Sequence, residues 1–394
     1  MKKLTVKDII LKGKRVLMRA DFNVPQDANL NITDDTRIRA TLPTIRYILE
    51  NGAQKLILLS HLGRPDGKAV EKYSLKPVAR RLQELLGQPV KFVNDCAGES
   101  ARKEAQAAKE SVVLMENLRF HPEEEANGPA FAKELALLGD VYVNDAFGTA
   151  HRAHASTEGV AHYLKAAAGL LLEKEIEYLG NAVQNPRRPF MVILGGAKVS
   201  DKIGVIENLL PKADVILIGG GMAYTFLKAQ GKTIGNSKLE KDKLDLAKSI
   251  LEKAAQLKKE LVLPVDHLVV DNIAPDAKVE FTVGADIPEG KIAVDIGQQT
   301  IKLFREKLKP AKTVIWNGPL GIFETDAFSK GSAEIARFIS SLGATTIIGG
   351  GDTAACVAKF KLEDKMTHIS TGGGASLEYL EGKILPGVAA LADK

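Results

Sequence analysis

The sequence predicts an α/β protein with two domains, each built on a mainly parallel β-sheet flanked by helices. Apolar runs typical of strands alternate with amphipathic runs typical of helices along the whole chain, as in repeated βα units. With 394 residues, the chain is longer than a single hydrophobic core usually supports, so two domains are expected. The proline-rich segment 185–189 ends a long helical pattern and precedes the apolar run 190–194. We therefore place the domain boundary there, with the preceding helix as the connection.

The first half of the chain contains five strand-like runs with helix-like segments between them. The predicted strands cover residues 15–20, 55–60, 90–93, 112–115 and 140–143. One helix is predicted to run from Ser74, which can cap it, to Leu86, where Gly87 ends it. Further helices are predicted over residues 99–110 and 169–184.

The second half repeats one pattern four times: an apolar run, a glycine cluster and a helix-like stretch. The runs 190–194, 215–218, 346–348 and 368–371 lead into glycines 195–196, 219–221, 349–351 and 372–374. A helix begins with unpaired N–H groups and the positive end of its dipole, and glycines before it let an anion approach closely. A single such turn is weak evidence, because glycine often serves only as a tight connection. Four of them in one half-chain predict a surface that holds phosphates.

The composition is that of an ordinary globular protein and argues against several classes of function. Apolar residues make up 45% of the chain, charged residues 26% and aromatic residues 5%, too few for a platform that stacks single-stranded nucleic acid. The net charge is +5 with both signs interspersed, so no nucleic-acid partner is expected. We expect no secretory signal and no membrane span. Cys96 and Cys356 lie outside any Cys/His metal spacing, and two buried, reduced thiols fit a cytoplasmic protein.

Cationic and polar residues follow the predicted strands of the first half. They lie in segments 19–25, 60–65, 119–121 and 144–154, and Arg37 lies in a polar stretch before a helix. Open α/β sheets bind ligands at the carboxyl ends of their strands, and arginine offers paired donors to carboxylate and phosphate. Each arginine alone is as easily a solvated surface residue, but the set favours an anion site. Four are therefore predicted to converge on one small polyanion: Arg37, Arg64, Arg119 and Arg152.

Five of the seven histidines also lie in the first half. His151 and His154 have no third ligand at a regular spacing, which argues against a metal site. No GxSxG motif accompanies His61, which argues against a catalytic triad. We interpret these histidines as structural or substrate-positioning residues.

The second half has phosphate-binding features without a standard nucleotide fingerprint, because neither GxxxxGK[ST] nor GxGxxG occurs. Lys198 and Lys202 follow the first glycine turn; they either reach bound phosphates or lie on a solvated helix face, and the turn favours the first reading. Asp352 can cap the helix that begins beside it, hold Mg²⁺, or do both. The loop 316–321 and Glu324 are suited to line a pocket for a base and a sugar.

An anion site in one domain and a phosphate site in the other predict phosphoryl transfer. That reaction needs positioning, charge neutralisation and exclusion of water more than a covalent nucleophile. A nicotinamide-dependent dehydrogenase would need GxGxxG and a ribose-binding acid, which are missing. A non-catalytic anion-binding protein with two domains would usually be exported, which disfavours it here.

Taken together, the motifs resemble those of the phosphoglycerate kinase family. Nine segments follow the family's order over essentially the whole chain: RADFNVP, SHLGRP, ENLRF, NDAFGTAHRAH, GGAKVSDK, GGGMAYTFLK, WNGPLGIFE, GGGDTAA and STGGGASLE. The resemblance implies two Rossmann-like domains joined by a helix, with a cleft between them. It implies residues 1–170 for phosphoglycerate binding, 171–185 for the connecting helix, 186–375 for nucleotide binding and 376–394 for a tail returning to the N-terminal domain.

The resemblance also implies a reaction, its cofactors and a working state. The reaction is the reversible, in-line transfer of a phosphoryl group from 1,3-bisphosphoglycerate to MgADP, giving 3-phosphoglycerate and MgATP in glycolysis, after hinge closure of the cleft. ATP or ADP and Mg²⁺ are the implied cofactors, and a cytoplasmic monomer with neither a nucleic-acid nor a membrane partner is expected.

Residue roles follow from the motifs that match the family. The implied substrate-binding residues are Asp21, Phe22, Asn23, Arg37, His61, Leu62, Gly63, Arg64, Arg119 and Arg152. The implied nucleotide-binding residues are Lys198, Lys202, Gly219, Gly220, Asn317, Pro319, Glu324, Gly350, Gly351, Asp352 and Thr353. Asp352 is the implied metal ligand, and the implied catalytic residues are Arg37, Lys198, Gly350 and Gly373.

Overall fold

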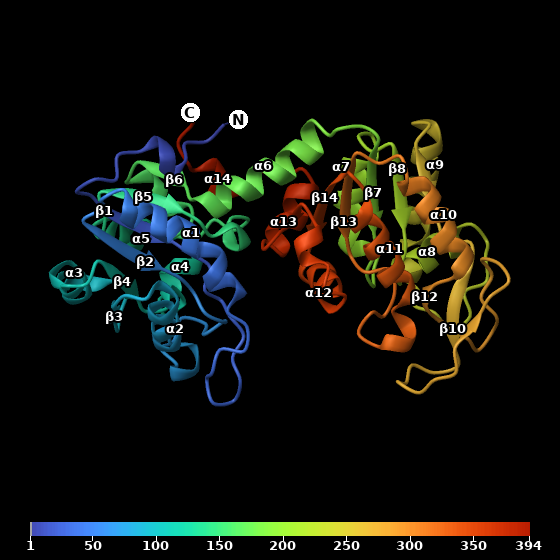
Figure 1. Cartoon of the computed structure of the whole chain (residues 1–394), viewed down its shortest axis with the longest axis horizontal. Coiled ribbons are helices and arrows are strands. Elements are labelled where there is room, and N and C mark those ends of the chain that lie inside the picture. Colours follow the sequence, from blue (N-terminus) through green and yellow to red (C-terminus); the bar gives the residue numbers. More distant parts are fainter. Residues whose placement is uncertain (1) are drawn as a thin grey trace. The chain divides into compact units, whose positions relative to one another are not determined.

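The computed structural model describes residues 2–394, which form two compact units (Figure 1). Unit 1 comprises residues 2–177 together with Ile384–Lys394, and unit 2 comprises Tyr178–Lys383. The border between them falls inside helix α6 (Leu170–Gln184). Residues 376–383, which we expected in the returning tail, belong to unit 2, because helix α13 (Gly374–Leu380) packs against α7 (Ile203–Leu209) there.

The core of unit 1 is a sheet of six parallel strands in the order β3-β4-β2-β1-β5-β6 (Figure 1). The strands are β1 (Arg15–Arg19), β2 (Lys55–Leu59), β3 (Val90–Val93), β4 (Val112–Met115), β5 (Val141–Asn144) and β6 (Ala166–Ala168). Arg19, the last residue of β1, pairs in register with Leu59 of β2 and Asn144 of β5. The carboxyl ends of the central strands therefore lie at one edge of the sheet, as the sequence analysis predicts.

Helices and short 3₁₀ turns surround this sheet. The α-helices are α1 (Thr36–Glu50), α2 (Lys76–Leu86), α3 (Gly98–Ala107), α4 (Pro122–Glu125), α5 (Pro129–Ala136), the start of α6, and α14 (Pro386–Ala389). The 3₁₀ turns are η1 (Val6–Asp8), η2 (Glu71–Tyr73), η3 (Leu118–Phe120), η4 (Phe147–Thr149) and η5 (Gly159–His162). Helix α2 was expected from Ser74 but begins at Lys76, and the Ser74 hydroxyl donates to Glu116 at 2.7 Å. The helix ends at Gly87 in the left-handed conformation, as predicted.

The end of the chain is held on unit 1 by backbone hydrogen bonds. Leu4 N–H donates to the carbonyl of Ala392 at 2.8 Å, and Gly387 N–H donates to the carbonyl of Ala150 at 2.8 Å. Lys3 also forms an ion pair with Asp393 at 2.9 Å. Residues from both ends of the chain thus complete the same unit, and both termini lie on it (Figure 1).

Unit 2 is built on a second sheet of six parallel strands, in the order β15-β14-β13-β7-β8-β9. Its strands are β7 (Phe190–Leu194), β8 (Val215–Ile218), β9 (Glu260–Val262), β13 (Thr313–Asn317), β14 (Thr345–Gly349) and β15 (His368–Ile369). Asn317, at the end of β13, pairs in register with Leu194 of β7 and Gly349 of β14. Three of the glycine-containing loops therefore leave the sheet side by side.

The remaining elements of unit 2 include a small antiparallel sheet that the sequence analysis did not assign. This sheet has the order β11-β10-β12 and consists of β10 (His267–Val270), β11 (Glu280–Phe281) and β12 (Ile292–Ile296). The helices not yet named are α8 (Met222–Ala229), α9 (Leu244–Gln256), α10 (Gln298–Leu308), α11 (Lys330–Ser341) and α12 (Gly351–Lys359). The 3₁₀ turns are η6 (Ser200–Lys202), η7 (Lys241–Lys243), η8 (Asp326–Phe328) and η9 (Glu363–Lys365).

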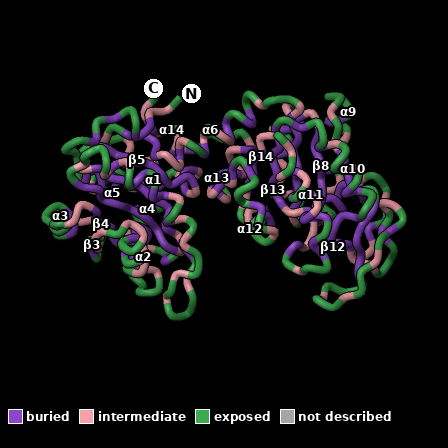
Figure 2. The backbone as a smooth tube through the Cα atoms, viewed as in Figure 1, coloured by how far each residue is buried: buried purple, intermediate pink, exposed green. Residues whose placement is uncertain are grey.

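Each unit has its own hydrophobic core around its parallel sheet (Figure 2). The central strands β2 and β7 are buried along their whole length, which is expected for parallel strands covered on both faces. Among residues 2–394, no helix combines the length and the apolarity that a bilayer crossing requires.

Candidate functional site

In unit 1, the loops after β1 and β2 place polar groups around one glycine. Gly63 N–H donates to Asn23 Oδ1 at 2.9 Å, and the carbonyl of Gly63 accepts from Arg119 Nη1 at 2.8 Å. A Cβ atom on Gly63 would lie 2.3 Å from the ring of Tyr73, and its φ is +64°. Only glycine fits this position without strain, and its backbone fixes the side chains of Asn23 and Arg119.

Arg37 enters the same edge of the sheet from the first turn of α1. Its Nη1 lies 3.1 Å and 3.0 Å from the two carboxylate oxygens of Asp21. Asp21 Oδ1 also accepts from the backbone N–H of Asn23 at 3.1 Å. The Arg37 side chain is 38% exposed, so its guanidinium is oriented by Asp21 and keeps donors for a ligand.

A second arginine, Arg19, lies beneath this surface and was not among the predicted site residues. It is 0% exposed, and its Nε donates to Ser156 Oγ at 2.8 Å. Its Nη1 donates to the carbonyl of Ala20, and its Nη2 lies 3.1 Å from His61 Nδ1. The sequence signal for it is its place as the last residue of a buried strand, where a charged side chain needs internal partners.

Two histidines in this cluster are held neutral among positive charges. Burial lowers the pKa of His61 well below its ordinary value of 6.5, and Arg19, Arg119 and Arg37 lower that pKa further. Burial lowers the pKa of His154 to about 3, with Arg119, Arg19 and Arg152 acting in the same direction. Arg19 contacts His61, and Arg119 donates to the carbonyl of Gly63, two residues further along the chain, so this surface carries positive charge that suits a polyanion.

One buried carboxylate lies under the arginines. Glu124 is 0% exposed and accepts from the backbone N–H of Ser156 at 2.9 Å and from its hydroxyl at 2.6 Å. Burial raises the pKa of Glu124, while the charges of Arg19 and Arg119 lower it. Hydrogen bonds through Ser156 therefore link the carboxylate of Glu124 to the guanidinium of Arg19.

The other predicted residues of unit 1 differ in how closely they join the cluster. Arg152 is half-buried, its Nε donates to His151 Nε2 at 3.3 Å, and its charge lowers the pKa of Arg119 and of His154. Arg64 is exposed, and within the described residues it makes no ion pair or hydrogen bond. Phe22 and Leu62 are buried, so their contacts with any ligand must come from the backbone.

In unit 2, the loops after β7, β8 and β13 pack backbone against backbone. Gly196 N–H donates to the carbonyl of Pro319 at 2.9 Å, and Gly220 N–H donates to that of Leu320 at 2.9 Å. A Cβ atom on Gly195 would lie 2.1 Å from the Pro319 carbonyl oxygen. Close packing of the loops therefore accounts by itself for glycine at several of these positions, including Gly219, where a Cβ would lie 2.5 Å from Leu320.

Gly351, at the start of α12, and Gly373, before α13, border open space instead. Gly350 has a φ of +88° and Gly373 a φ of +51°. A Cβ atom on Gly351 or Gly373 would meet no atom within 4 Å. Open space therefore lies in front of helix N–H groups at the two places where the sequence analysis expects phosphates.

Lys202 and Asn317 form the buried polar centre of this face. Burial lowers the pKa of Lys202, while the carboxylates of Asp201, Asp352 and Glu381 raise it. Lys202 Nζ donates to Asn317 Oδ1. Asn317 is 1% exposed, and its Nδ2 is buried without a hydrogen-bond partner in the described part of the chain. A half-buried ammonium and an unpaired amide donor fit an anionic ligand such as a nucleotide phosphate.

Three further predicted residues present exposed charges. Lys198, Glu324 and Asp352 are exposed, and no side-chain ion pair or hydrogen bond of theirs occurs among residues 2–394. The cap of α12 is Gly350 and has no side-chain capping bond, so Asp352 does not act as a helix cap here. A free carboxylate beside a phosphate-binding loop fits a Mg²⁺ ligand. Thr353, in contrast, is buried, and its hydroxyl accepts from Gly318 N–H at 2.6 Å.

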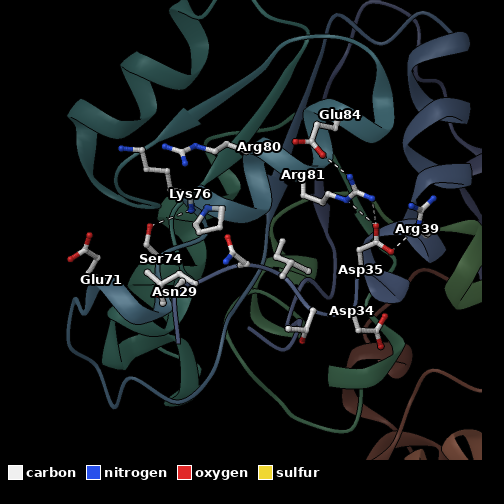
Figure 3. A pocket seen from close by; sticks show the side chains of 15 residues that line it. Asn29, Asp34, Asp35, Arg39, Glu71, Ser74, Lys76, Arg80, Arg81 and Glu84 are labelled. Carbon is white, nitrogen blue, oxygen red and sulfur yellow. Dashed lines mark hydrogen bonds and ion pairs between the residues drawn. The ribbon is translucent and has the colours of Figure 1, made fainter. Parts of the chain in front are cut away.

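A cavity of about 810 Å³ lies elsewhere in unit 1, between residues 29–35 and the start of α2 (Figure 3). Arg81 spans it, with Nη2 2.7 Å from Asp35 Oδ2 and Nη1 2.5 Å from Glu84 Oε2. The side chains of Lys76 and Arg80 also extend from α2, in the same direction as each other and away from Arg81 (Figure 3). The cavity is lined by none of the predicted site residues, so cavity volume alone would not locate the arginine cluster.

The fold and these two sets of residues are typical of a phosphotransferase that handles two anionic reactants. Residues 6–383 match the family model for phosphoglycerate kinase. The chain is 58% identical to a phosphoglycerate kinase of Koribacter versatilis and 56% identical to one of Moorella thermoacetica, and each alignment covers 100% of both chains. The phosphoglycerate kinase structure from Coxiella burnetii matches with a TM-score of 0.91 and 44% identity, and that from Pyrococcus horikoshii with 0.84 and 34%; each covers 98% of both chains. The chain belongs to the phosphoglycerate kinase family.

Proposed function

We propose that the protein transfers a phosphoryl group reversibly between 1,3-bisphosphoglycerate and MgADP, giving 3-phosphoglycerate and MgATP, which is the glycolytic reaction of its family. The observation that carries this proposal is the arginine cluster of unit 1, in which Arg37 is held by Asp21, Arg119 by the carbonyl of Gly63, and Arg19 lies against His61. Such a cluster suits a small substrate with one carboxyl and one or two phosphate groups.

The phosphoglycerate would be held on unit 1 by side chains and by backbone. Arg119 and Asn23 are fixed on Gly63, and Arg37 is oriented by Asp21, so their donors are organised before the substrate arrives. The proposed substrate-binding residues are Asp21, Phe22, Asn23, Arg37, His61, Leu62, Gly63, Arg64, Arg119 and Arg152. Phe22 and Leu62 would act through their backbone, and Asp21 chiefly by holding Arg37.

The nucleotide would be held on unit 2. Lys202, Asn317 Nδ2 and the N–H groups at Gly350 and Gly351 would bind phosphate oxygens, and Lys198 would follow the transferring group. Gly219, Gly220 and Pro319 would line the adenine, and Glu324 would bind ribose hydroxyls. Thr353 would act indirectly, by holding Gly318 in place. Asp352 would hold Mg²⁺, which supplies charge neutralisation for the phosphates.

Transfer itself needs charge stabilisation and no covalent nucleophile from the protein. Negative charge spreads over the oxygens of the transferring group, and Arg37, Lys198 and the N–H groups near Gly350 and Gly373 would stabilise it. His61 would donate a hydrogen bond from its neutral ring. Motion about the helix shared by the two units would bring the reactants together and exclude water. We also propose that the enzyme works as a cytoplasmic monomer.

The proposal is tested by mixing the purified protein, MgATP and 3-phosphoglycerate, and by following formation of ADP through a coupled dehydrogenase. Turnover should require both substrates and magnesium, so each is left out in turn as a control. Nucleotide binding without any turnover would reject the phosphoglycerate assignment and leave the unit 2 site standing. Loss of both would reject the phosphotransferase function.

A further inference from the structure

Three side chains with metal-binding chemistry meet in unit 1, and none of them is among the residues assigned above. One ligand atom each from Asp95, Cys96 and His121 lies within 4.8 Å of the other two. Asp95 and Cys96 follow strand β3, and His121 follows turn η3, which lies after the neighbouring strand β4. The 24 residues between Cys96 and His121 follow no metal-binding spacing, so this group is created by the pairing of β3 with β4.

The three groups are held in place by contacts around them. Asp95 Oδ1 lies 2.7 Å from His121 Nε2, and it accepts from the backbone N–H of Cys96 at 2.6 Å. The His121 ring packs against Phe131, with 5.2 Å between ring centroids. Cys96 is 1% exposed, whereas the side chains of His121 and Asp95 are 30% and 54% exposed. The sulfur therefore lies at the base of the group, and the nitrogen and oxygen ligands lie on the solvent side.

We propose that Asp95, Cys96 and His121 bind a divalent transition-metal ion of the zinc type. Zinc takes four tetrahedral ligands from cysteine, histidine and carboxylate, and three protein ligands plus one water form a common set. With Zn–S near 2.3 Å and Zn–N or Zn–O near 2.0–2.2 Å, the ligand atoms of such a site lie roughly 3.4–3.6 Å apart. The ligand atoms lie within 4.8 Å of one another and Asp95 Oδ1 is 2.7 Å from His121 Nε2, so metal binding would require side-chain rotations that bring all three to that spacing. The thiol of Cys96 loses its proton to solvent as the metal–sulfur bond forms.

The competing interpretation is an ion pair between Asp95 and His121 beside an inert buried thiol. It explains the 2.7 Å contact, but it gives no role to Cys96. The two interpretations predict different effects of metal on stability. A bound ion would link the β3–α3 connection to the η3 turn, which carries Arg119, and would therefore stabilise unit 1. An ion pair alone gives no metal-dependent stability.

Cobalt(II) replaces zinc as the spectroscopic probe, because a cobalt–thiolate bond gives a charge-transfer band in the near ultraviolet. The full-length protein, freed of metal by a chelator, is titrated with Co²⁺, and its melting temperature is measured with and without Zn²⁺. We expect one thiolate-bound Co²⁺ per chain and a rise of the melting temperature with Zn²⁺. Cys96→Ser should abolish the band, and His121→Ala should weaken binding at least about tenfold.

Cys356→Ser is the matched control, because Cys356 is the other buried free cysteine, lies in unit 2 and belongs to no such group. It should keep the band and the zinc effect. If Cys96→Ser does not fold, Asp95→Asn and His121→Ala replace exposed ligands and still decide the question. The proposal is overturned if the parent protein has no band, if the band survives in Cys96→Ser, or if the dissociation constant is weaker than about 1 mM.

Discussion

Arg19→Met would remove a buried guanidinium while leaving a long unbranched side chain in its place. In the parent protein that guanidinium lies 3.1 Å from His61 Nδ1 and 2.8 Å from Ser156 Oγ. A guanidinium can only donate, so His61 Nδ1 must be the acceptor, and the ring proton of the neutral histidine must lie on Nε2. Arg19 thereby sets the tautomer in which His61 Nε2 is a hydrogen-bond donor for the substrate.

The size of the effect follows from that one contact. A hydrogen bond from a charged donor contributes about 1.5–3 kcal/mol, which favours the Nε2–H tautomer by roughly 10- to 150-fold. Arg19→Met should remove this preference. It should also raise the pKa of His61 toward its ordinary value, since Arg19 is the largest charge effect on that pKa after burial. The KM for 3-phosphoglycerate should rise by up to the same factor, with little change in the KM for ATP.

The direct assay is ¹⁵N NMR of the histidine rings, which distinguishes the two tautomers and follows their titration. Arg15→Met is the matched control: Arg15 lies at the other end of β1, at the surface, and its Nη2 is 2.6 Å from Asp140. A parent protein with the proton of His61 on Nδ1 would refute the reasoning, and so would an unchanged tautomer in Arg19→Met. If the variant unfolds, the companion change Glu124→Gln should restore it, because an unpaired buried charge costs about 3–5 kcal/mol.

Three other predictions test the remaining assignments. Arg37→Ala should lower kcat on the order of 10³–10⁵-fold with little change in nucleotide affinity, and a loss smaller than about tenfold in steady-state kinetics would reject its role in charge stabilisation. Asp352→Asn should raise the magnesium concentration needed for half-maximal activity; an unchanged magnesium titration would leave the carboxylate without a metal role. Burial raises the pKa of Asp145 from 3.8 to about 7, so the stability contributed by the protonated carboxyl is complete below pH 3.8 and is lost as pH rises through 7. In the parent protein the free energy of unfolding should fall by up to about 4 kcal/mol between pH 4 and 7, and Asp145→Asn should reduce this fall. Urea denaturation at several pH values measures it. The same pH dependence in parent and variant would contradict the role of Asp145.

The strands of the parallel sheets are predictable from sequence because they are buried on both faces. The runs 90–93, 112–115, 190–194 and 215–218 agree with the observed strands residue for residue. Helix α2 begins at Lys76, two residues later than predicted; the Ser74 hydroxyl accepts from Lys76 N–H at 3.2 Å, while Leu75 N–H donates to Glu116, a residue distant in sequence. The small antiparallel sheet was missed because its strands are short; β11 has only two residues, too few for any periodicity.

The four glycine clusters predict phosphate binding from the sequence. The sequence does not show which clusters could contact a phosphate and which only allow loops to pack closely. The atoms around each glycine distinguish the clusters. A side chain at Gly195 or Gly220 would collide with the backbone of a neighbouring loop, whereas Gly351 and Gly373 border open space. The first pair would be needed even in a protein without a nucleotide. It is the second pair, together with the unpaired Nδ2 of Asn317, that argues for a ligand.

The arginines of unit 1 also differ in burial, which the sequence does not show. The sequence places Arg119 after a strand and Arg37 before a helix and predicts an anion site, but it cannot show that Arg37 is partly exposed while Arg19 is fully buried. Arg19 is buried because β1 lies between β2 and β5, a consequence of strand order rather than of local sequence. The cluster therefore has two layers with different roles. Arg37 is 38% exposed and can bind the substrate directly, whereas Arg19 is fully buried and orients the ring of His61. The neutral ring can then offer a hydrogen-bond donor without adding a positive charge.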